Sequence, residues 1–87
     1  MIRFRLRELM ADKGFREGRR ITMEEVSEKT GVHRTTLSKI ANQKGYVTNT
    51  SVLDQLCAYF QVTTNEVAEY VPDEEAQDEI AETQENT

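Results

Sequence analysis

Gly31 stands between two short segments whose apolar residues recur at helical spacing, and this feature limits the folds open to the 87-residue chain more than any other. Thr22 and Glu25 have the spacing of a capping box, in which a hydroxyl and a carboxylate satisfy backbone amides at the start of a helix. Glycine readily adopts the left-handed conformation that ends many helices. We therefore predict a helix over 23–30, a sharp turn at Gly31 and a second helix over 33–43.

The two predicted helices have the spacing of a helix-turn-helix, and each position that this motif constrains holds a suitable residue. A small residue, Ser27, stands where the second helix crosses closely over the first. At about 100° per residue, the apolar residues of the second helix share one side and its polar residues share the other. The apolar side would hold the helix on the core and leave the polar side exposed. The interior positions are filled by Val26, Val32, Leu37, Ile40 and Ala41.

The polar side of the helix over 33–43 carries side chains suited to reading DNA. An α-helix fits the major groove, where arginine or lysine binds guanine, asparagine binds adenine and the threonine methyl contacts the thymine methyl. On these grounds Arg34, Thr35 and Lys39 are the leading base-reading candidates. Ser38 and Asn42 are second choices.

Contacts with DNA phosphates are expected on both sides of this helix. The first amides of the helix over 23–30, together with the Thr22 hydroxyl, are suited to bind a phosphate. His33 is expected at the start of the second helix, where a neutral ring would cap the helix or contact a phosphate. The remaining candidates precede the first helix or follow the second, and they are Arg16, Arg19, Arg20, Lys44, Tyr46 and Asn49.

The charges of the chain are divided between its two halves. Residues 1–49 contain all 11 lysines and arginines with six acidic residues, whereas residues 50–87 contain ten acidic residues and no lysine or arginine. The net charge of −5 therefore conceals a basic half that would attract a polyanion such as DNA. Seven of the acidic residues lie in 73–87, which has too few apolar side chains to pack. We expect a folded domain over 1–72 and a flexible acidic tail over 73–87.

The N-terminal segment permits two interpretations. Leu6, Leu9 and Met10 have helical spacing and predict a helix over 3–13 that ends at Gly14. Residues 1–5 also alternate between apolar and basic side chains, so a short strand is the competing prediction. The basic segment 15–20 is expected to be a loop.

The second half of the domain carries two more capping-box patterns. Ser51 with Asp54 predicts a helix whose apolar stripe includes Cys57, which we expect to be a core residue. Thr63 with Glu66 predicts a short final helix. A loop is expected over 44–50, and Pro72 is expected to close the folded part.

From about Arg3 to Val71 the chain resembles the lambda-repressor-like, Cro-type helix-turn-helix domain of bacterial and phage regulators. The resemblance rests on ITMEEVSEKTGVHRTTLSKIAN and SVLDQLCAYFQVTTNEVAEYV. It implies a compact, all-α, five-helix fold in which residues 1–4 pair with 68–71 as a two-strand clasp. It also implies a homodimer on a symmetric DNA site, with the dimer contacts at Val67, Tyr70 and Val71.

The same resemblance implies roles for individual positions. The positions that commonly face bases match Arg34, Thr35, Ser38 and Lys39. The resemblance also implies further positions near phosphates. Together with the candidates given above, the full set of expected phosphate contacts is Arg16, Arg19, Arg20, Thr22, Met23, Thr36, Asn42, Lys44, Tyr46 and Asn49.

These patterns predict a sequence-specific, double-stranded DNA-binding transcriptional regulator, a repressor, encoded by a bacterium or phage and located in the cytoplasm. We expect no enzyme activity, cofactor or metal, because the sequence has no catalytic set and His33 lacks a nearby cysteine or second histidine. No segment has the roughly 18 apolar residues of a membrane helix. Two alternatives stay open. One is an antitoxin or accessory module of a toxin–antitoxin or phage system whose acidic tail binds a basic protein, and the other is a protein-interaction module without DNA affinity.

Overall fold

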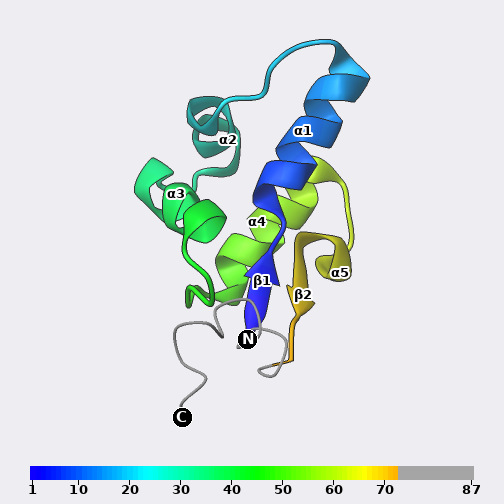
Figure 1. Ribbon diagram of the computed structural model, residues 1–87. Helices are drawn as coiled ribbons and strands as arrows, with labels where there is room; N and C mark the ends of the chain where they lie inside the picture. The colour runs from blue at the N-terminus through cyan, green and yellow to red at the C-terminus, as the bar shows by residue number, and fades with distance from the viewer. Residues whose placement is uncertain (73–87) are drawn as a thin grey trace.

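Five helices and one two-stranded sheet form residues 1–72, the part of the chain that the computed structural model describes (Figure 1). The predicted five-helix fold is confirmed, whereas the acidic tail predicted over 73–87 lies outside the described residues. In Figure 1, α2 and α3 lie on one side of the molecule and α5 with β2 on the other. In chain order the elements are β1 (Ile2–Phe4), α1 (Leu6–Glu17), α2 (Met23–Thr30), α3 (Arg34–Asn42), α4 (Thr50–Phe60), α5 (Thr64–Val67) and β2 (Ala68–Tyr70).

The core draws apolar side chains from all five helices. α4 contributes two of them from the stripe predicted for it, and Cys57 of the same helix is half-buried against the core, as expected. The connections before α2 and α3 each add one residue. Helix propensity alone would not hold such short helices together, so the shared core supplies most of their stability. The buried apolar residues are Leu6, Ile21, Val26, Val32, Leu37, Ile40, Leu56, Phe60 and Val67.

The predicted clasp between the two ends of the domain is confirmed. β1 and β2 pair antiparallel, with Ile2 opposite Tyr70 and Phe4 opposite Ala68. A main-chain bond of 2.8 Å from the Arg5 amide to the Val67 carbonyl continues the pairing toward the core. The strand alternative for the N-terminal segment is therefore correct for residues 2–4, and the first helix begins only at Leu6.

The end predicted for the first helix is wrong, because α1 continues through Gly14 and ends at Glu17. Gly18 takes the left-handed conformation with φ 69°, and its amide and that of Arg19 both donate to the Gly14 carbonyl. A Cβ atom on Gly14 would lie 2.6 Å from the Arg19 carbonyl oxygen. Gly14 thus allows the chain to fold back over the end of the helix, and the basic loop expected over 15–20 is reduced to the residues after Glu17.

The start of α4 also differs from its prediction. Asn49 caps the helix, because its Oδ1 accepts the Val52 amide at 3.0 Å, so the capping box expected at Ser51 is wrong. Asparagine is among the best N-cap residues, and here it acts two positions earlier. The box predicted for the last helix is confirmed, with the Thr63 amide donating to Glu66 Oε1 at 3.0 Å.

Candidate nucleic-acid interface

The turn between α2 and α3 has the predicted helix-turn-helix geometry. Gly31 ends α2 with φ 79°, and its amide donates to the Ser27 carbonyl at 2.9 Å. The Ser27 hydroxyl donates to the Val32 carbonyl at 2.6 Å. Ser27 is therefore more than a small residue at a helix crossing, since its hydroxyl ties α2 to the residue that leads into α3.

Thr30 is a second tie across the turn, and sequence reasoning missed it. Its side chain is buried, at 5% exposure. The hydroxyl donates to the Val26 carbonyl at 2.7 Å and accepts the Val32 amide at 3.1 Å. A hydroxyl can donate and accept at the same time, so one side chain satisfies two backbone groups inside the turn. A threonine directly before the helix-ending glycine was the available signal.

α3 has one buried face and one exposed face, as predicted. Leu37 and Ile40 are buried in the core, and Ala41 packs against it. The four expected base readers lie on the outer face, where all of them are exposed: Arg34, Thr35, Ser38 and Lys39. α3 also lies at the outside of the molecule in Figure 1. This arrangement provides the access that base reading needs, and the base contacts themselves stay a prediction.

Arg34 is one of the two exposed cations among the base-reading candidates of this face. Its side chain is 67% exposed and makes a long ion pair of 3.8 Å with Glu24. An ion pair between two exposed side chains contributes little energy, so the guanidinium is available to another acceptor. His33 precedes it as the N-cap residue of α3, but its ring makes no capping hydrogen bond, so the capping role expected for it is wrong.

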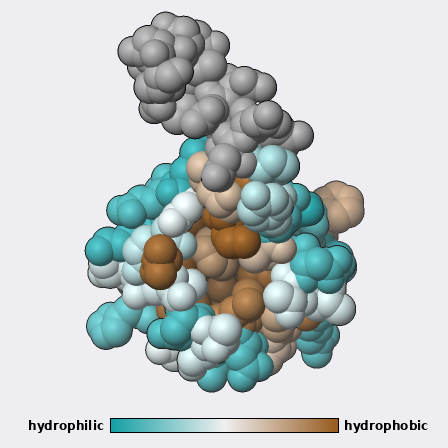
Figure 2. Space-filling model, turned by 90° about the horizontal axis from the view of Figure 1, so that it is seen from below, coloured by the Kyte–Doolittle hydropathy of each residue, from teal (hydrophilic) through white to brown (hydrophobic). Residues whose placement is uncertain are grey.

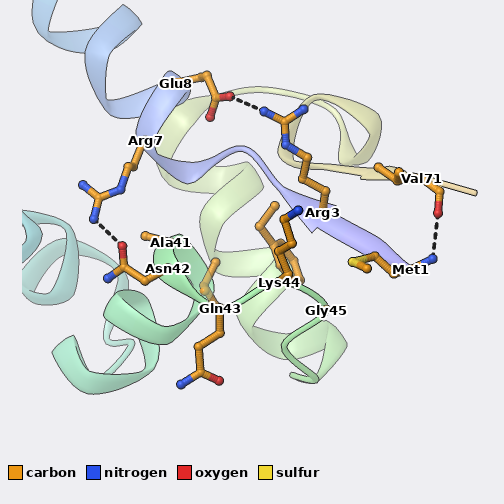
Figure 3. A pocket seen from close by; sticks show the side chains of 12 residues that line it. Met1, Arg3, Arg7, Glu8, Ala41, Asn42, Gln43, Lys44, Gly45 and Val71 are labelled. Atoms are coloured by element: carbon orange, nitrogen blue, oxygen red, sulfur yellow. Dashed lines mark hydrogen bonds and ion pairs between the residues drawn. The ribbon is translucent and has the colours of Figure 1, made fainter. Parts of the chain in front are cut away.

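Asn42, at the end of α3, is bound from within the molecule. Arg7 of α1 donates to Asn42 Oδ1 at 2.6 Å, across a cleft of about 450 Å³ between β1, α1 and the end of α3 (Figure 3). Asn42 Nδ2 in turn donates to Ser38 Oγ at 3.3 Å. One lone pair of the amide oxygen and one amide proton are thus already used, so the contact that we predicted between Asn42 and DNA would use the second of either.

The start of α2 retains the geometry of a phosphate-binding position. Thr22 is the N-cap, and its hydroxyl accepts the Glu25 amide at 3.1 Å. The first amides of a helix lack partners within the helix and carry partial positive charge, which favours an anion. The predicted capping box is only half correct, because the Glu25 carboxylate binds Arg19 instead of the Thr22 amide.

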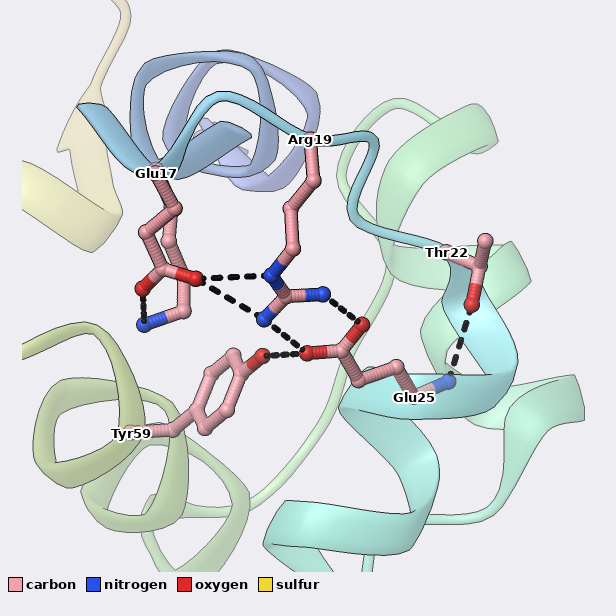
Figure 4. A network of polar contacts seen from close by, with 6 residues as sticks. Glu17, Arg19, Thr22, Glu25 and Tyr59 are labelled. Atoms are coloured by element: carbon pink, nitrogen blue, oxygen red, sulfur yellow. Dashed lines mark hydrogen bonds and ion pairs between the residues drawn. The ribbon is translucent and has the colours of Figure 1, made fainter. Parts of the chain in front are cut away.

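Arg19 lies at the centre of a polar network that joins α1, α2 and α4 (Figure 4). It donates from Nη1 and Nη2 to the two Glu25 oxygens at 2.7 and 2.6 Å, and from Nε to Glu17 at 2.9 Å. Tyr59 of α4 donates to the same Glu25 carboxylate at 3.3 Å. The phosphate contact expected of Arg19 would have to compete with these carboxylates. Sequence reasoning missed Glu17 and Tyr59, since only the fold brings them to this point.

The pKa values of this network follow from its contacts. Hydrogen bonds from Arg19 lower the pKa of Glu25, and the hydrogen bond from Lys13 lowers the pKa of Glu17, with Arg19 adding to it. Burial raises the pKa of Tyr59, and the charge of Glu25 raises it further. The Glu25 carboxylate is therefore charged and neutralised by Arg19 at neutral pH. This pairing reduces the repulsion that a carboxylate at the start of α2 would otherwise exert on a phosphate.

The other expected phosphate contacts differ in exposure. Met23 and Tyr46 are half-buried and pack against the core, which leaves only part of each side chain for DNA. Thr36 is also half-buried. The exposed candidates are Arg16, Arg20, Thr22, Lys44 and Asn49, of which Asn49 also caps α4.

Neither a metal-binding cluster nor a membrane-spanning helix occurs among the described residues 1–72. This part of the chain holds no group of three or more histidine, cysteine, aspartate or glutamate residues placed to bind a metal ion. Among the helices described, none combines the length and apolar character needed to cross a bilayer.

The fold, the turn at Gly31 and the exposed polar face of α3 define a helix-turn-helix DNA-binding domain. More narrowly, the chain belongs to the Cro/C1-type HTH DNA-binding domain family, whose model matches residues 5–73. Comparisons with curated proteins and with solved structures gave no significant match. The match of the family model confirms the Cro-type resemblance identified in the sequence.

Proposed function

We propose that this protein is a sequence-specific transcriptional regulator that inserts α3 into the major groove of double-stranded DNA and acts as a homodimer on a symmetric site. The observation that carries the proposal is the placement of four exposed polar side chains on α3 opposite the buried Leu37 and Ile40. A domain that occupies its operator excludes other proteins from the same DNA, so repression is its simplest effect. We place it in the cytoplasm of a bacterium or of a phage host.

Base reading is assigned to the exposed face of α3. Arg34, at the start of the helix, and Lys39, more than a turn further on, would donate to guanine O6 and N7. Thr35 offers a methyl group for thymine and a hydroxyl for a base edge. Ser38 stands on the same face, and its hydroxyl would donate to or accept from a base.

Phosphate binding is assigned to the start of α2 and to exposed basic residues around it. The first amides of α2 would bind one phosphate, with Thr22 holding the turn in place. Arg20 lies two residues before Thr22 and is exposed, so it is well placed to bind a neighbouring phosphate. Such contacts position the domain and supply much of the affinity, but they carry no sequence information directly.

Two arginine variants separate these roles, and each is first tested for unchanged folding. A selection from a random duplex library defines the preferred site. Fluorescence anisotropy then measures affinity for that site and for random duplex over a salt series. Arg34→Ala should lose about tenfold or more in discrimination at one base pair. Arg20→Ala should weaken binding to all duplexes equally and reduce the salt slope by about 1. Equal effects of both variants on specificity would contradict the assignment.

The charge of the C-terminal segment favours a second candidate. Residues 73–87 contain seven acidic residues and no lysine or arginine, a composition suited to binding a basic protein. In this case the chain would be an antitoxin or accessory module of a toxin–antitoxin or phage system. Co-purification of a small basic protein with the full chain, lost when 73–87 is deleted, supports this candidate. Specific DNA binding without such a partner supports the regulator alone.

A further inference from the structure

Exposed apolar side chains gather around one groove of the molecule. The described residues include four large apolar side chains that are exposed, and three of them line this groove: Ile2 at 44%, Val47 at 85% and Tyr70 at 67%. The groove has a volume of about 550 Å³. Figure 2, a view of the end of the domain that carries the clasp, shows hydrophobic residues gathered around a hollow. We call this feature the clasp groove.

One face of the β1–β2 sheet is apolar and lines the clasp groove, whereas the other face carries charged side chains. Successive side chains of a strand point to opposite faces, so Ile2 and Phe4 share a face with their partners Tyr70 and Ala68. This apolar face lines the groove, and the connection between α3 and α4 forms its other wall. Arg3 lies on the opposite face, where it pairs with Glu69 at 2.8 Å.

We propose that the clasp groove binds a second copy of this chain, which gives the homodimer of the proposed function its interface. In a two-fold dimer each copy uses the same surface, so this surface must contain both a hollow and groups that fill a hollow. The clasp groove has both, because Val47 and Tyr70 project from its rim. A tyrosine that enters an apolar groove can bury about 150–250 Å².

The chemistry of the groove argues against two other occupants, DNA and the chain's own segment 73–87. DNA is a polyanion, and the groove offers it no basic side chain, because the one residue with a charged side chain among those lining it is Glu69, which pairs with Arg3 on the other face of the sheet. The segment 73–87 has a single isoleucine among seven acidic residues, so it is poorly suited to fill an apolar hollow. A second copy would leave the base-reading face of α3 uncovered, because none of its base-reading candidates lines the groove, although two expected phosphate contacts, Tyr46 and Asn49, do line it.

The groove would form the centre of the contact between two copies. A standard interface takes roughly 20–30 residues from each partner, so surface around the groove would also take part. A symmetric operator that holds two copies together would stabilise the dimer further. One contact expected from the sequence is wrong: Val67 is fully buried and cannot meet a partner, whereas Tyr70 can.

Sedimentation equilibrium on the full chain tests the groove. Val47→Glu would place a carboxylate in the interface and should weaken self-association about tenfold or more. Phe15→Glu is the matched control, because Phe15 is 89% exposed on α1 and does not line the groove. Tyr70→Ser removes a projecting group without adding charge and should weaken the dimer as well. Thermal unfolding of each variant identifies any that is not folded.

The outcomes separate the interface from the DNA-binding proposal. A wild-type chain that stays monomeric at high concentration, or a Val47→Glu variant that associates as well as Phe15→Glu, overturns the groove as the self-association surface. A folded, monomeric Val47→Glu variant that keeps its affinity for a half-site and loses cooperative binding to the full site supports it. Failure of wild type to discriminate any half-site would instead refute the proposed function, whatever its mass.

A second inference rests on a separate observation, the hydrogen bonds that run from Arg7 through Asn42 to Ser38. A guanidinium has no acceptor, so the Asn42 oxygen must face Arg7. The Asn42 amino group then faces Ser38, whose oxygen accepts from it. The Ser38 hydroxyl proton is not used in this bond and can be donated to another acceptor. Ser38 lies on the exposed face of α3.

We infer that Arg7 is a positioning residue that makes Ser38 a hydrogen-bond donor toward DNA. This inference rests on the proposed function. A donor on this face favours base pairs whose major-groove edge offers an acceptor, such as guanine N7 and O6 or thymine O4. It disfavours the amino groups of cytosine and adenine. Arg7 itself comes from α1 and does not need to touch DNA for this effect.

Reversing the direction of the hydrogen bonds tests the inference. In Asn42→Asp the carboxylate can only accept, so it would take bonds from both Arg7 and the Ser38 hydroxyl. Ser38 would then present lone pairs, and site selection should move toward cytosine or adenine amino groups at one position, by about fivefold. Ser38→Ala should lose the preference in either background. An unchanged preference in Asn42→Asp overturns the inference, also where the added charge lowers the affinity for all sites equally.

Discussion

Replacing Thr30 by valine tests how strongly the turn depends on one buried hydroxyl. The two side chains have nearly the same shape, so Thr30→Val leaves no cavity, but the Val32 amide loses the acceptor that lies 3.1 Å away. An unsatisfied buried donor costs about 1–3 kcal/mol. Burial of the added methyl group offsets about 0.8 kcal/mol of this. We expect a net loss of about 0.2–2.2 kcal/mol in the free energy of unfolding, which for a domain of this size lowers Tm by roughly 1–18 °C.

Urea unfolding followed by circular dichroism measures this difference, with Thr35→Val as the control. Thr35 is exposed on α3, so the same chemical change there should stay within about 0.5 kcal/mol of wild type. The sign of the Thr30 result is informative. If the hydroxyl were not needed, valine would stabilise the domain by adding buried apolar surface. A Thr30→Val variant as stable as wild type, or more stable, would refute the role of Thr30 in closing the turn.

Three further changes have expected outcomes. Gly31→Ala should destabilise the domain by about 1–2 kcal/mol in urea unfolding. Alanine is strained at a φ of 79°, and no atom lies near the added Cβ, so backbone strain is the whole cost; unaltered stability would show that the turn can relax. Gly14→Ala should also destabilise, despite the higher helix propensity of alanine, since its Cβ would meet the Arg19 carbonyl at 2.6 Å; a more stable variant would contradict this contact. The pKa of Glu25 is lowered from 4.5 by Arg19, so the stability from this pair is fully present above pH 4.5 and is lost as the pH falls through the lower folded value. Arg19→Gln should therefore flatten the acid limb of Tm against pH, and an identical limb would exclude the pair as its cause.

The parts of the fold that sequence predicted well are those decided by neighbouring residues. α2 runs from Met23 to Thr30 as predicted, because Thr22 caps its start and Gly31 permits the left-handed turn at its end. The exposed and buried faces of α3 follow from the period of the helix alone. The pairing of β1 with β2 is not local, and it was expected only from the resemblance to the Cro-type family.

The errors occur where tertiary contacts decide between two local solutions. Gly14 and Gly18 both suit the end of a helix, and the way the chain returns over α1 selects the second. Glu25 has the correct spacing for a capping box, but Arg19 offers it a stronger, charge-assisted partner.

The same reasoning applies to the candidate site. Exposure of the α3 face was predictable from periodicity, whereas the use of Asn42 by Arg7 was not, because 35 residues separate them in the chain. Burial of Thr30 likewise depends on how α2 and α3 pack. Sequence patterns thus predict the surface that we propose meets DNA, while the fold decides which of its side chains are already bound within the molecule.

The clasp closes a long loop of the chain. Arg3 and Glu69 lie 66 positions apart, so pairing β1 with β2 fixes a loop nearly as long as the domain, whereas each helix closes over a few residues. Segments held by such distant contacts open more readily than the core, and their amide hydrogens exchange sooner. Because the clasp also forms a wall of the groove, a copy bound there would hold it shut through thermodynamic linkage. Deuterium uptake in the two strands would then slow with rising protein concentration and report assembly without any label.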